Sequence, residues 1–377
     1  MRIAILESII MPAGHEVEFD RILVNELKKQ GHTPCFFVPE KFPFKIDYGI
    51  DIEYLEGGEV ITYAGAGRLK KLWLAMLREK RRIAWFNSAF AMAQEGKCDA
   101  IIVPTATYRY LRTLRNSKLK GSPLPVYFIF HGINMHEKKR FEKQARACLP
   151  YTNINLRVIS LRNDFQDSGL DNVKIIPPPV FLPLNYELSK EISISSPLKI
   201  GFFGQFRKEK NLGFLLDAFI KAQFNIPVEL IVQGATAKPE DGEAFVQYAR
   251  DYAKHKNITF CHKSLIGDAW QKALLGVDII IMPYAAERYL YHWSAMLFTA
   301  IGYYKAVLLS AEINPEVLAK YKIGAAVQLD SVETFARQLE EFMDDFAKHT
   351  NIYRKNLLLA NKEYSHEALI KNILNEN

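Results

Sequence analysis

The stretch LKIGFFGQFRKEKNLGFLLDAF, residues 198–219, decides the fold of this 377-residue chain. It opens with a continuous apolar run, which predicts a buried strand ending near Gly204, and it closes with apolar residues at helical spacing. Arg207, Lys208 and Lys210 lie in the turn between them. A glycine lets the backbone approach a ligand closely, and basic side chains beside a helix N-terminus suit a diphosphate. The stretch therefore predicts a strand–turn–helix unit whose basic turn either binds an anion or is simply solvated.

The same alternation of strand and helix patterns extends in both directions along the chain. Short apolar runs predict strands over residues 3–6, 34–38, 100–103, 126–130, 157–160, 198–203, 228–232, 258–260, 278–282 and 307–309. Helical spacing predicts helices over residues 16–30, 68–94, 108–118, 212–222, 242–253, 294–303, 332–347 and 352–374, and Asn211 is the expected capping residue of the fourth. Continuous apolar strands separated by helices are typical of parallel sheets covered on both faces.

A proline-rich segment interrupts this alternation once. Residues 177–197 hold five prolines, which cannot continue a helix or a central strand. We expect an interdomain linker there, one domain over residues 1–176, a second over 198–350, and a C-terminal helix over 351–377 that packs back toward the first domain. The predicted fold class is α/β, with two doubly wound Rossmann-like domains facing a cleft. Ligands of such sheets bind outside the carboxyl ends of the strands, where the strand order reverses.

Composition narrows the class of protein. No apolar run reaches the roughly 18–20 residues that span a bilayer, and the N-terminus has no signal-peptide pattern, so we expect a cytoplasmic protein. The four scattered cysteines predict buried thiols rather than disulfides or a zinc site. Patterns for a P-loop, a zinc-protease helix, a nucleophile elbow and a metal-binding Asp-x-Asp pair are absent from the sequence. We therefore expect no metal and no cofactor, with basic side chains and helix dipoles neutralising a bound diphosphate.

A second polar stretch, DIIIMPYAAERYLYHWSAMLFTAIGYYKAVLL, spans residues 278–309. Its apolar strand runs into Tyr284, and a loop with acidic, basic and aromatic side chains follows. Ser294 is expected to cap the next helix, whose first amides, at Ala295 and Met296, would attract an anion. The alternative is an ordinary strand–helix–strand unit, but the density of hydrogen-bonding groups in the loop favours a binding site.

In order and spacing, the two stretches resemble the donor-binding half of GT-B glycosyltransferases, and within these the retaining family 4 group. Members typically carry Gly-Arg-x-x-x-x-Lys after the first strand of the second domain, which matches Gly204, Gln205 and Lys210 here. The resemblance implies that Lys210 binds the donor diphosphate. Gln205 occupies the position of the family's arginine, so Arg207 is the candidate substitute for it.

The second signature of that family is a pair of glutamates eight residues apart. The resemblance places the first at Glu287, with a catalytic role, and implies that Tyr284 and the amides near Ser294 line the donor site. Thr299 takes the position of the second glutamate, which would hold the nucleotide ribose. Because Thr299 follows Glu287 by twelve residues, the loop is four residues longer than in the family, which leaves the choice of nucleotide open.

The first half of the chain resembles the same family through two residues. Gly14 lies in the first strand-to-helix loop, where the family has a glycine near the donor phosphates, and His131 follows a buried strand, where the family often has a histidine close to the transferred sugar. The resemblance implies a retaining enzyme without a dedicated protein base. An inverting enzyme would need a base near the acceptor oxygen, for which His131, His136 or Glu137 are candidates.

Positive charge is concentrated in the first half of the chain. The formal net charge is +7, and residues 68–146 alone hold 18 basic and 5 acidic side chains. Residues 68–90 have an apolar side at helical spacing, and their cations, among them Lys70, Lys71, Arg81 and Arg82, fall mostly elsewhere. These four are candidates to bind an anionic membrane or acceptor; the alternative is that the apolar side packs into the core. Nucleic acid is disfavoured as a partner, because no nucleic-acid-binding motif is present.

The resulting prediction is a glycosyltransferase that moves a sugar from a nucleoside diphosphate donor to a hydroxyl of a glycan or lipid-linked acceptor, in surface polysaccharide or lipopolysaccharide synthesis. Two alternatives stay open. A non-catalytic GT-B protein would bind a glycan or a partner, and a sugar-nucleotide epimerase would change the donor without any acceptor.

Overall fold

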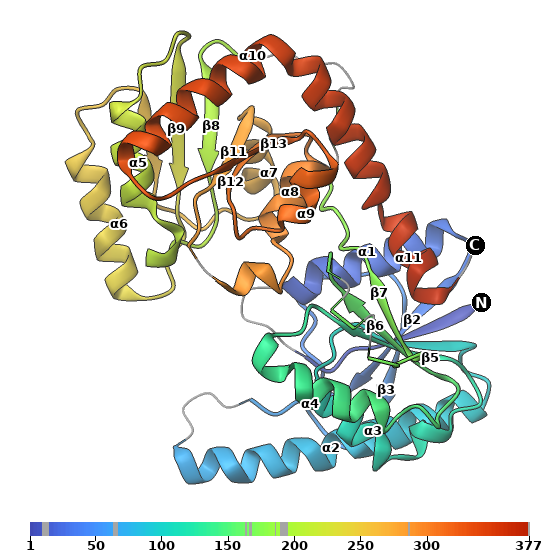
Figure 1. Cartoon of the computed structure of the whole chain (residues 1–377). Coiled ribbons are helices and arrows are strands. Elements are labelled where there is room, and N and C mark those ends of the chain that lie inside the picture. The colour runs from blue at the N-terminus through green and yellow to red at the C-terminus, as the bar shows by residue number, and fades with distance from the viewer. Residues whose placement is uncertain are drawn as a thin grey trace. The chain divides into compact units, whose positions relative to one another are not determined.

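The computed structural model describes residues 1–9, 15–62, 67–162, 164–165, 168–184, 186–188, 195–285 and 287–375. The chain forms two compact units, each built on one parallel sheet (Figure 1). Unit 1 comprises Met1–Pro177 and His366–Asn377, and unit 2 comprises Pro178–Ser365. Both sheets have the strand order of doubly wound folds, so the predicted α/β class with two Rossmann-like domains is confirmed.

Unit 1 contains a seven-stranded sheet in the order β3-β2-β1-β4-β5-β6-β7. Its strands are β1 Arg2–Leu6, β2 Thr33–Pro39, β3 Asp51–Leu55, β4 Ala100–Val103, β5 Val126–Phe130, β6 Ile154–Ile159 and β7 Val173–Ile176. Ile3 of β1 pairs in parallel with Pro34 of β2 on one side and with Ala100 of β4 on the other. The strand order therefore reverses between β1 and β4, and the carboxyl ends of these two strands flank the switch point.

The helices of unit 1 pack around this sheet. They are α1 His15–Lys29, α2 Arg68–Gln94, α3 Tyr108–Arg115, α4 Met135–Arg146 and α11 His366–Leu374, with a 3₁₀ turn, η1, at Lys118–Gly121. The helix α2 packs with its second half, where Trp85, Phe86 and Ala89 are buried. The last of these helices, α11, lies beside α1, although the two are at opposite ends of the chain (Figure 1). Arg157 of β6 donates from Nε to the carbonyl oxygens of Asn372 and Ile373, at 3.2 and 3.1 Å. A cation at a helix C-terminus is stabilising, so Arg157 helps to hold α11 on unit 1.

Unit 2 contains a six-stranded sheet in the order β10-β9-β8-β11-β12-β13. Its strands are β8 Leu198–Phe202, β9 Val228–Gln233, β10 Ile258–Cys261, β11 Ile279–Met282, β12 Ala306–Ser310 and β13 Gly324–Val327. Its helices are α5 Leu212–Lys221, α6 Pro239–Asp251, α7 Gly267–Leu275, α8 Ala295–Gly302, α9 Pro315–Lys320 and α10 Val332–Glu363, with 3₁₀ turns η2 at Lys208–Lys210 and η3 at Glu287–Leu290. The strand order reverses between β8 and β11, which makes the carboxyl ends of these strands the expected ligand-binding edge.

The C-terminal region divides differently from the expected boundary at residue 350. The helix α10 continues to Glu363 through a kink at His349, and only α11 belongs to unit 1. The start of the expected linker is also packed rather than loose, because Val180 and Phe181 donate backbone hydrogen bonds to the carbonyls of Tyr364 and Phe298 within unit 2. Val180 is thus buried within unit 2, whereas Leu182 and Leu184 are exposed.

The cysteines differ in accessibility, which gives a first testable prediction. Cys35, Cys98 and Cys148 are buried, whereas Cys261 is half-buried. Burial raises the pKa of Cys98 to about 12 and that of Cys148 to about 11, and thiol reagents attack the thiolate form. Ellman's reagent is therefore expected to modify one thiol of the native protein, and four after unfolding in urea. A Cys261→Ser variant that still releases one equivalent without denaturant would contradict this assignment.

Candidate functional site

The ligand-binding edge of unit 2 is formed by two loops that leave neighbouring strands. The loop after β8 carries Gly204 and Lys210, and the loop after β11 carries Tyr284. The two are joined directly, since the Ala285 amide donates to the carbonyl of Glu209 at 2.9 Å. Because β8 and β11 are parallel neighbours at the point where the strand order reverses, both quoted sequence stretches meet at the switch point of the sheet.

Gly204 sits at the centre of this edge in a conformation that favours glycine. Its φ is +100°, its amide donates to Gln233 Oε1 at 2.9 Å, and its carbonyl accepts from the Ala235 amide at 3.1 Å. A Cβ placed on Gly204 would lie 3.3 Å from Lys210 Nζ and 3.7 Å from Met296 Cε. Three of the residues that we expected at the donor site are therefore brought together at one point.

Lys210 is held in place from two sides. It is only 8% exposed, and its Nζ donates to the carbonyl of Phe203 at 3.2 Å and lies 4.7 Å from the centroid of the Tyr284 ring. A cation over an aromatic face is attracted to the ring, so Tyr284 orients the ammonium group. Asn211, which follows, has the left-handed φ of +52° rather than the extended backbone expected of a capping residue. The turn before α5 is thus fixed by the left-handed backbone of Asn211 and by the contacts of Lys210, and not by a side-chain cap.

Arg207 contacts Gln205, the residue that occupies the position of the family's arginine. Its Nη2 donates to Gln205 Oε1 at 3.1 Å, and Nη1 lies 3.4 Å from a carboxylate oxygen of Glu209. The guanidinium is about two-fifths exposed, so this ion pair is held only weakly. Gln205 and Arg207 therefore form one polar pair at the rim of the Gly204 loop.

The N-terminus of α8 lies at the same edge. Ser294 Oγ accepts a hydrogen bond from the Leu297 amide, which confirms the predicted cap. Ala295 is exposed and Met296 half-buried at the start of the helix, while Thr299 is buried one turn further on, where its hydroxyl donates to the carbonyl of Ala295 at 2.8 Å. Met296, the second residue of α8, reaches the Gly204 loop with its side chain, since its Cε would lie 3.7 Å from a Cβ on Gly204.

Two residues that the sequence did not single out hold these loops. Asn314, at φ +42°, accepts from the Ser294 amide at 2.8 Å and donates from Nδ2 to the carbonyls of Tyr289 and His292 at 3.3 and 3.4 Å. Gln233 accepts from the Gly204 amide and donates to the carbonyl of Lys263. The only sequence signal for Asn314 is the Asn-Pro pair, which indicates a turn but not its partners.

Two expected site residues fall partly or wholly outside this description. Gly14 lies outside the described residues. Glu287 begins η3, in the loop between Tyr284 and Ser294, but its side chain lies outside the description as well.

His131 marks the corresponding edge of unit 1. It follows β5, its Nε2 lies 2.9 Å from the carbonyl of Pro104, and its ring packs edge-on against Phe19 with 4.5 Å between centroids. Pro104 comes directly after β4, one of the two strands at the switch point of this sheet. A hydrogen bond to that carbonyl requires a proton on Nε2.

The four cations expected on one basic surface are divided. Arg82 is buried, with Nη1 3.2 Å from Glu79 and its guanidinium 4.1 Å from the centroid of the Tyr110 ring. Arg81 donates to the carbonyl of Glu59. Lys70 and Lys71 are exposed. Arg82 is thus part of the packing between α2 and α3, because its position on the helix faces the domain and not solvent.

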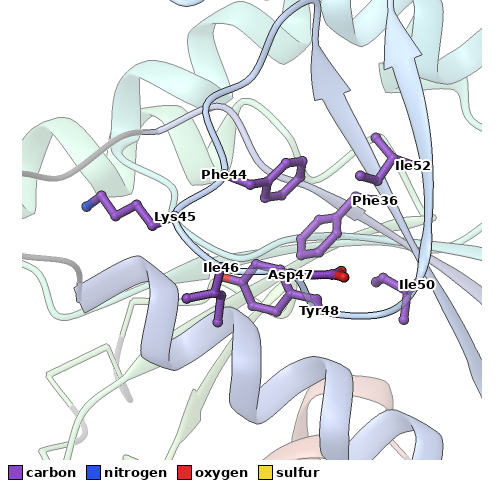
Figure 2. Close-up of a pocket in the computed structure, with 8 residues that line it drawn as sticks. All are labelled: Phe36, Phe44, Lys45, Ile46, Asp47, Tyr48, Ile50 and Ile52. Atoms are coloured by element: carbon purple, nitrogen blue, oxygen red, sulfur yellow. The ribbon is translucent and has the colours of Figure 1, made fainter. Parts of the chain in front are cut away.

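Two pockets among the described residues lie away from this edge. One of about 410 Å³ in unit 1 is lined by Phe36, Phe44, Lys45, Ile46, Asp47, Tyr48, Ile50 and Ile52 (Figure 2). Its three aromatic rings pack on one another, with centroids of Phe36 and Phe44 5.0 Å apart, beside the edge strand β3. A second, of about 390 Å³, lies in unit 2 beside Asp278 and Lys305, at the amino ends of β11 and β12. Neither pocket is at the carboxyl edge of its sheet, so the switch point remains the better candidate site.

Two searches among the described residues bear on other classes of protein. No group of three or more His, Cys, Asp or Glu side chains there is arranged to hold a metal ion. Over the same residues, no helix is both long enough and apolar enough to cross a membrane.

This chain matches known proteins in its fold but not in its sequence. No protein-family model matches the sequence, and no curated protein matches it. Solved structures match it over the whole chain. HepE of Anabaena in complex with UDP is 14% identical, with full coverage of both chains and a TM-score of 0.68. The apo form of the lipopolysaccharide outer core galactosyltransferase WaaB is 14% identical, also with full coverage of both chains, at a TM-score of 0.62.

WaaG, a glycosyltransferase involved in lipopolysaccharide biosynthesis, is a third such structure. It is 14% identical, with 98% of this chain and 99% of that chain covered, at a TM-score of 0.56. With sequence identity this low, the structural match establishes the fold and not the activity. The two parallel-sheet α/β units of this chain therefore have the GT-B fold of these glycosyltransferase structures.

Proposed function

We propose that this protein is a glycosyltransferase that takes its sugar from a nucleoside diphosphate donor bound at the switch point of unit 2. The observation that carries the proposal is the meeting of Gly204, Lys210 and the start of α8, with a Cβ position on Gly204 within 4 Å of both Lys210 Nζ and Met296 Cε. A glycine backbone, a buried ammonium and a helix N-terminus are the three groups that favour a diphosphate. The matching solved structure of HepE contains UDP, which makes uridine nucleotides the first ligands to test.

The proposed transfer depends on how the groups at this edge stabilise the negative charge of the leaving diphosphate. As the bond to the sugar breaks, negative charge develops on the leaving diphosphate, and the Lys210 ammonium and the α8 amides are fixed in advance to stabilise it. These groups need no metal ion for that role. We propose further that Glu287 and His131 act at the transferred sugar, that Thr299 lies toward the nucleotide ribose, and that Gly14 lies near the donor phosphates. The retaining family 4 assignment is part of the same proposal and rests on the sequence motifs.

The proposed acceptor is a hydroxyl of a glycan or of a lipid-linked glycan, in surface polysaccharide or lipopolysaccharide synthesis. The match to WaaB and WaaG, both described as lipopolysaccharide enzymes, supports this class. The excess of basic over acidic residues within 68–146 supports an acceptor or surroundings of negative charge.

Two other functions would use the same fold. A non-catalytic glycan-binding protein is favoured by the departures at Gln205 and Thr299, and it would bind a glycan without consuming a donor. A sugar-nucleotide epimerase would alter the donor in the absence of any acceptor. Incubation with UDP-sugars, with and without a glycan acceptor, followed by chromatography of the nucleotide products, separates the three: free UDP that forms only with the acceptor indicates transfer, a changed UDP-sugar without acceptor indicates epimerisation, and no change in either case is expected of binding alone.

The first experiment is a thermal-shift screen with nucleoside diphosphates and their sugars. A ligand present at a hundred times its dissociation constant stabilises the folded state by about 2.7 kcal/mol, which is readily measured. We expect at least one nucleoside diphosphate to raise the melting temperature, and the corresponding nucleoside to do so far less, because the proposed contacts are to the phosphates. Equal shifts with nucleoside and diphosphate, or none with any nucleotide, would overturn the proposed donor site.

A further inference from the structure

The amino-terminal turns of α2 expose an apolar row that the rest of the unit leaves uncovered. Leu69, Leu72, Trp73 and Met76 are 84%, 66%, 56% and 68% exposed, and they are the members of what we call the apolar row. Their spacing of three, four and seven residues places them on one side of the helix. Figure 1 shows these turns of α2 running out past α3 and α4. The expectation that this apolar side packs into the core is therefore wrong for the first half of the helix.

The core-facing side of α2 is a different one. Trp85, Phe86 and Ala89 are buried in the second half of the helix. At about 100° per residue, the centre of the apolar row lies roughly 145° around the helix from the centre of these three residues. The apolar row is thus a separate surface, and not an end of the packing stripe left bare where the domain stops.

The charges around the apolar row identify what can cover it. Lys70 and Lys80 are exposed cations on the turns that carry the apolar row, and the nearby carboxylate of Glu79 is paired with Arg82 and Arg112. A second copy of the chain would bring two clusters of cations together across the interface, where like charges repel. A surface that is apolar inside and negatively charged outside satisfies both sets of side chains at once. An anionic lipid bilayer has this arrangement, and helices that lie in it combine Trp and Leu with flanking Lys and Arg.

We propose that the apolar row inserts into the headgroup and acyl boundary of an anionic membrane, while Lys70 and Lys80 contact lipid headgroups. Lys80 is exposed one turn beyond Met76 on the same side, so a cation ends the apolar row. The inserted part is short, about 10 Å from Leu69 to Met76 at 1.5 Å per residue, which suits reversible attachment of a peripheral protein. Attachment then has two components: the attraction between lysines and headgroups, which salt screens, and the insertion of apolar side chains, which salt does not screen. The proposal does not rest on the transferase assignment, because membrane binding needs no donor.

Co-sedimentation with vesicles tests the proposal. The full-length protein is expected to bind vesicles of phosphatidylcholine mixed with phosphatidylglycerol, and to bind phosphatidylcholine vesicles much more weakly. A Leu72→Gln/Trp73→Gln variant is expected to bind the mixed vesicles about ten- to a hundredfold more weakly, because two large apolar side chains no longer enter the bilayer. Ile266→Gln is the matched control, since Ile266 is 79% exposed in unit 2, and it should bind like the unaltered protein.

Salt and quenching experiments separate insertion from simple charge attraction. Lys70→Gln/Lys80→Gln should bind more weakly at low salt and show a shallower salt dependence, while keeping quenching of tryptophan fluorescence by brominated lipid. Quenching should be lost when Trp73 alone is changed to Phe, although the three other tryptophans remain.

The proposal is overturned by any of three results. The first is a protein that ignores anionic vesicles at low salt. The second is a Leu72→Gln/Trp73→Gln variant that binds them as the unaltered protein does. The third is a concentration-dependent dimer, seen by sedimentation, that the same variant abolishes. Thermal shifts with nucleotides on these variants report the donor site separately, and they should not change.

Discussion

Replacing Lys210 with Met is expected to weaken binding of a nucleoside diphosphate by about 1.5–3 kcal/mol, or roughly 10- to 150-fold, the range for hydrogen bonds to charged groups. Met keeps most of the apolar stem that packs beside Tyr284, so the change removes mainly the ammonium group. Isothermal titration calorimetry with the nucleotide found in the thermal-shift screen gives the affinity directly.

The turn that carries Lys210 also offers the control. Lys208 lies two residues earlier, in the same 3₁₀ turn, and is exposed. Lys208→Met makes the same change in net charge and should alter the affinity little, because its ammonium is solvated and screened. Equal losses in the two variants would mean that the turn attracts the nucleotide only by its overall charge. An unchanged affinity in a folded Lys210→Met protein would remove Lys210 from the site.

Most of the core elements could be predicted from the sequence, because their signal is strong. The strands β1, β4, β5, β8 and β11 are continuous apolar runs, and all of them lie inside a sheet where both faces are covered. The missed strands, β3, β7 and β13, include both edges of unit 1 and one edge of unit 2. In β3, DIEYL mixes charged and apolar residues because one side of an edge strand faces water. Continuous apolar runs therefore mark the interior strands, whereas of the four edge strands only β10 has an apolar run that predicted it.

The candidate site was predictable where one residue type carries the geometry. Gly204 and Lys210 stood out because a glycine after a strand and a lysine before a helix have physical consequences that the sequence alone reveals. Arg82 was misplaced because a basic side chain on an amphipathic helix is normally solvated, whereas here Glu79, Thr113 and Tyr110 surround it. Such burial depends on partners from α3, which lie 28 residues or more along the chain from Arg82 and leave no local pattern.

Asn314 also has partners that no local sequence pattern reveals, and a substitution at this position gives the second large prediction. Its side chain is 5% exposed and makes three hydrogen bonds, to the Ser294 amide and to the carbonyls of Tyr289 and His292. Asn314→Ala would leave these backbone groups without that partner, at about 1 kcal/mol for each bond and more where the group stays buried. Ala also tolerates the left-handed backbone less well than Asn. We expect the loop that precedes α8 to lose its fixed position, and nucleotide affinity to fall with it.

Hydrogen exchange followed by mass spectrometry resolves this effect locally, which matters because a chain of two units has no single free energy of unfolding. In Asn314→Ala the Ser294 amide should exchange at least tenfold faster, since a hydrogen bond of about 1.4 kcal/mol or more corresponds to that factor. Asn314→Asp keeps an acceptor for this amide but turns a carboxylate toward two carbonyls, so it should protect Ser294 while still loosening Tyr289 and His292. The Leu230 amide, bonded to the carbonyl of Asn257 within the sheet, should keep its slow exchange in both variants. If Leu230 is lost together with Ser294, the substitution has unfolded unit 2 as a whole, and Asn314 is a core residue rather than the one that positions the donor-site loop.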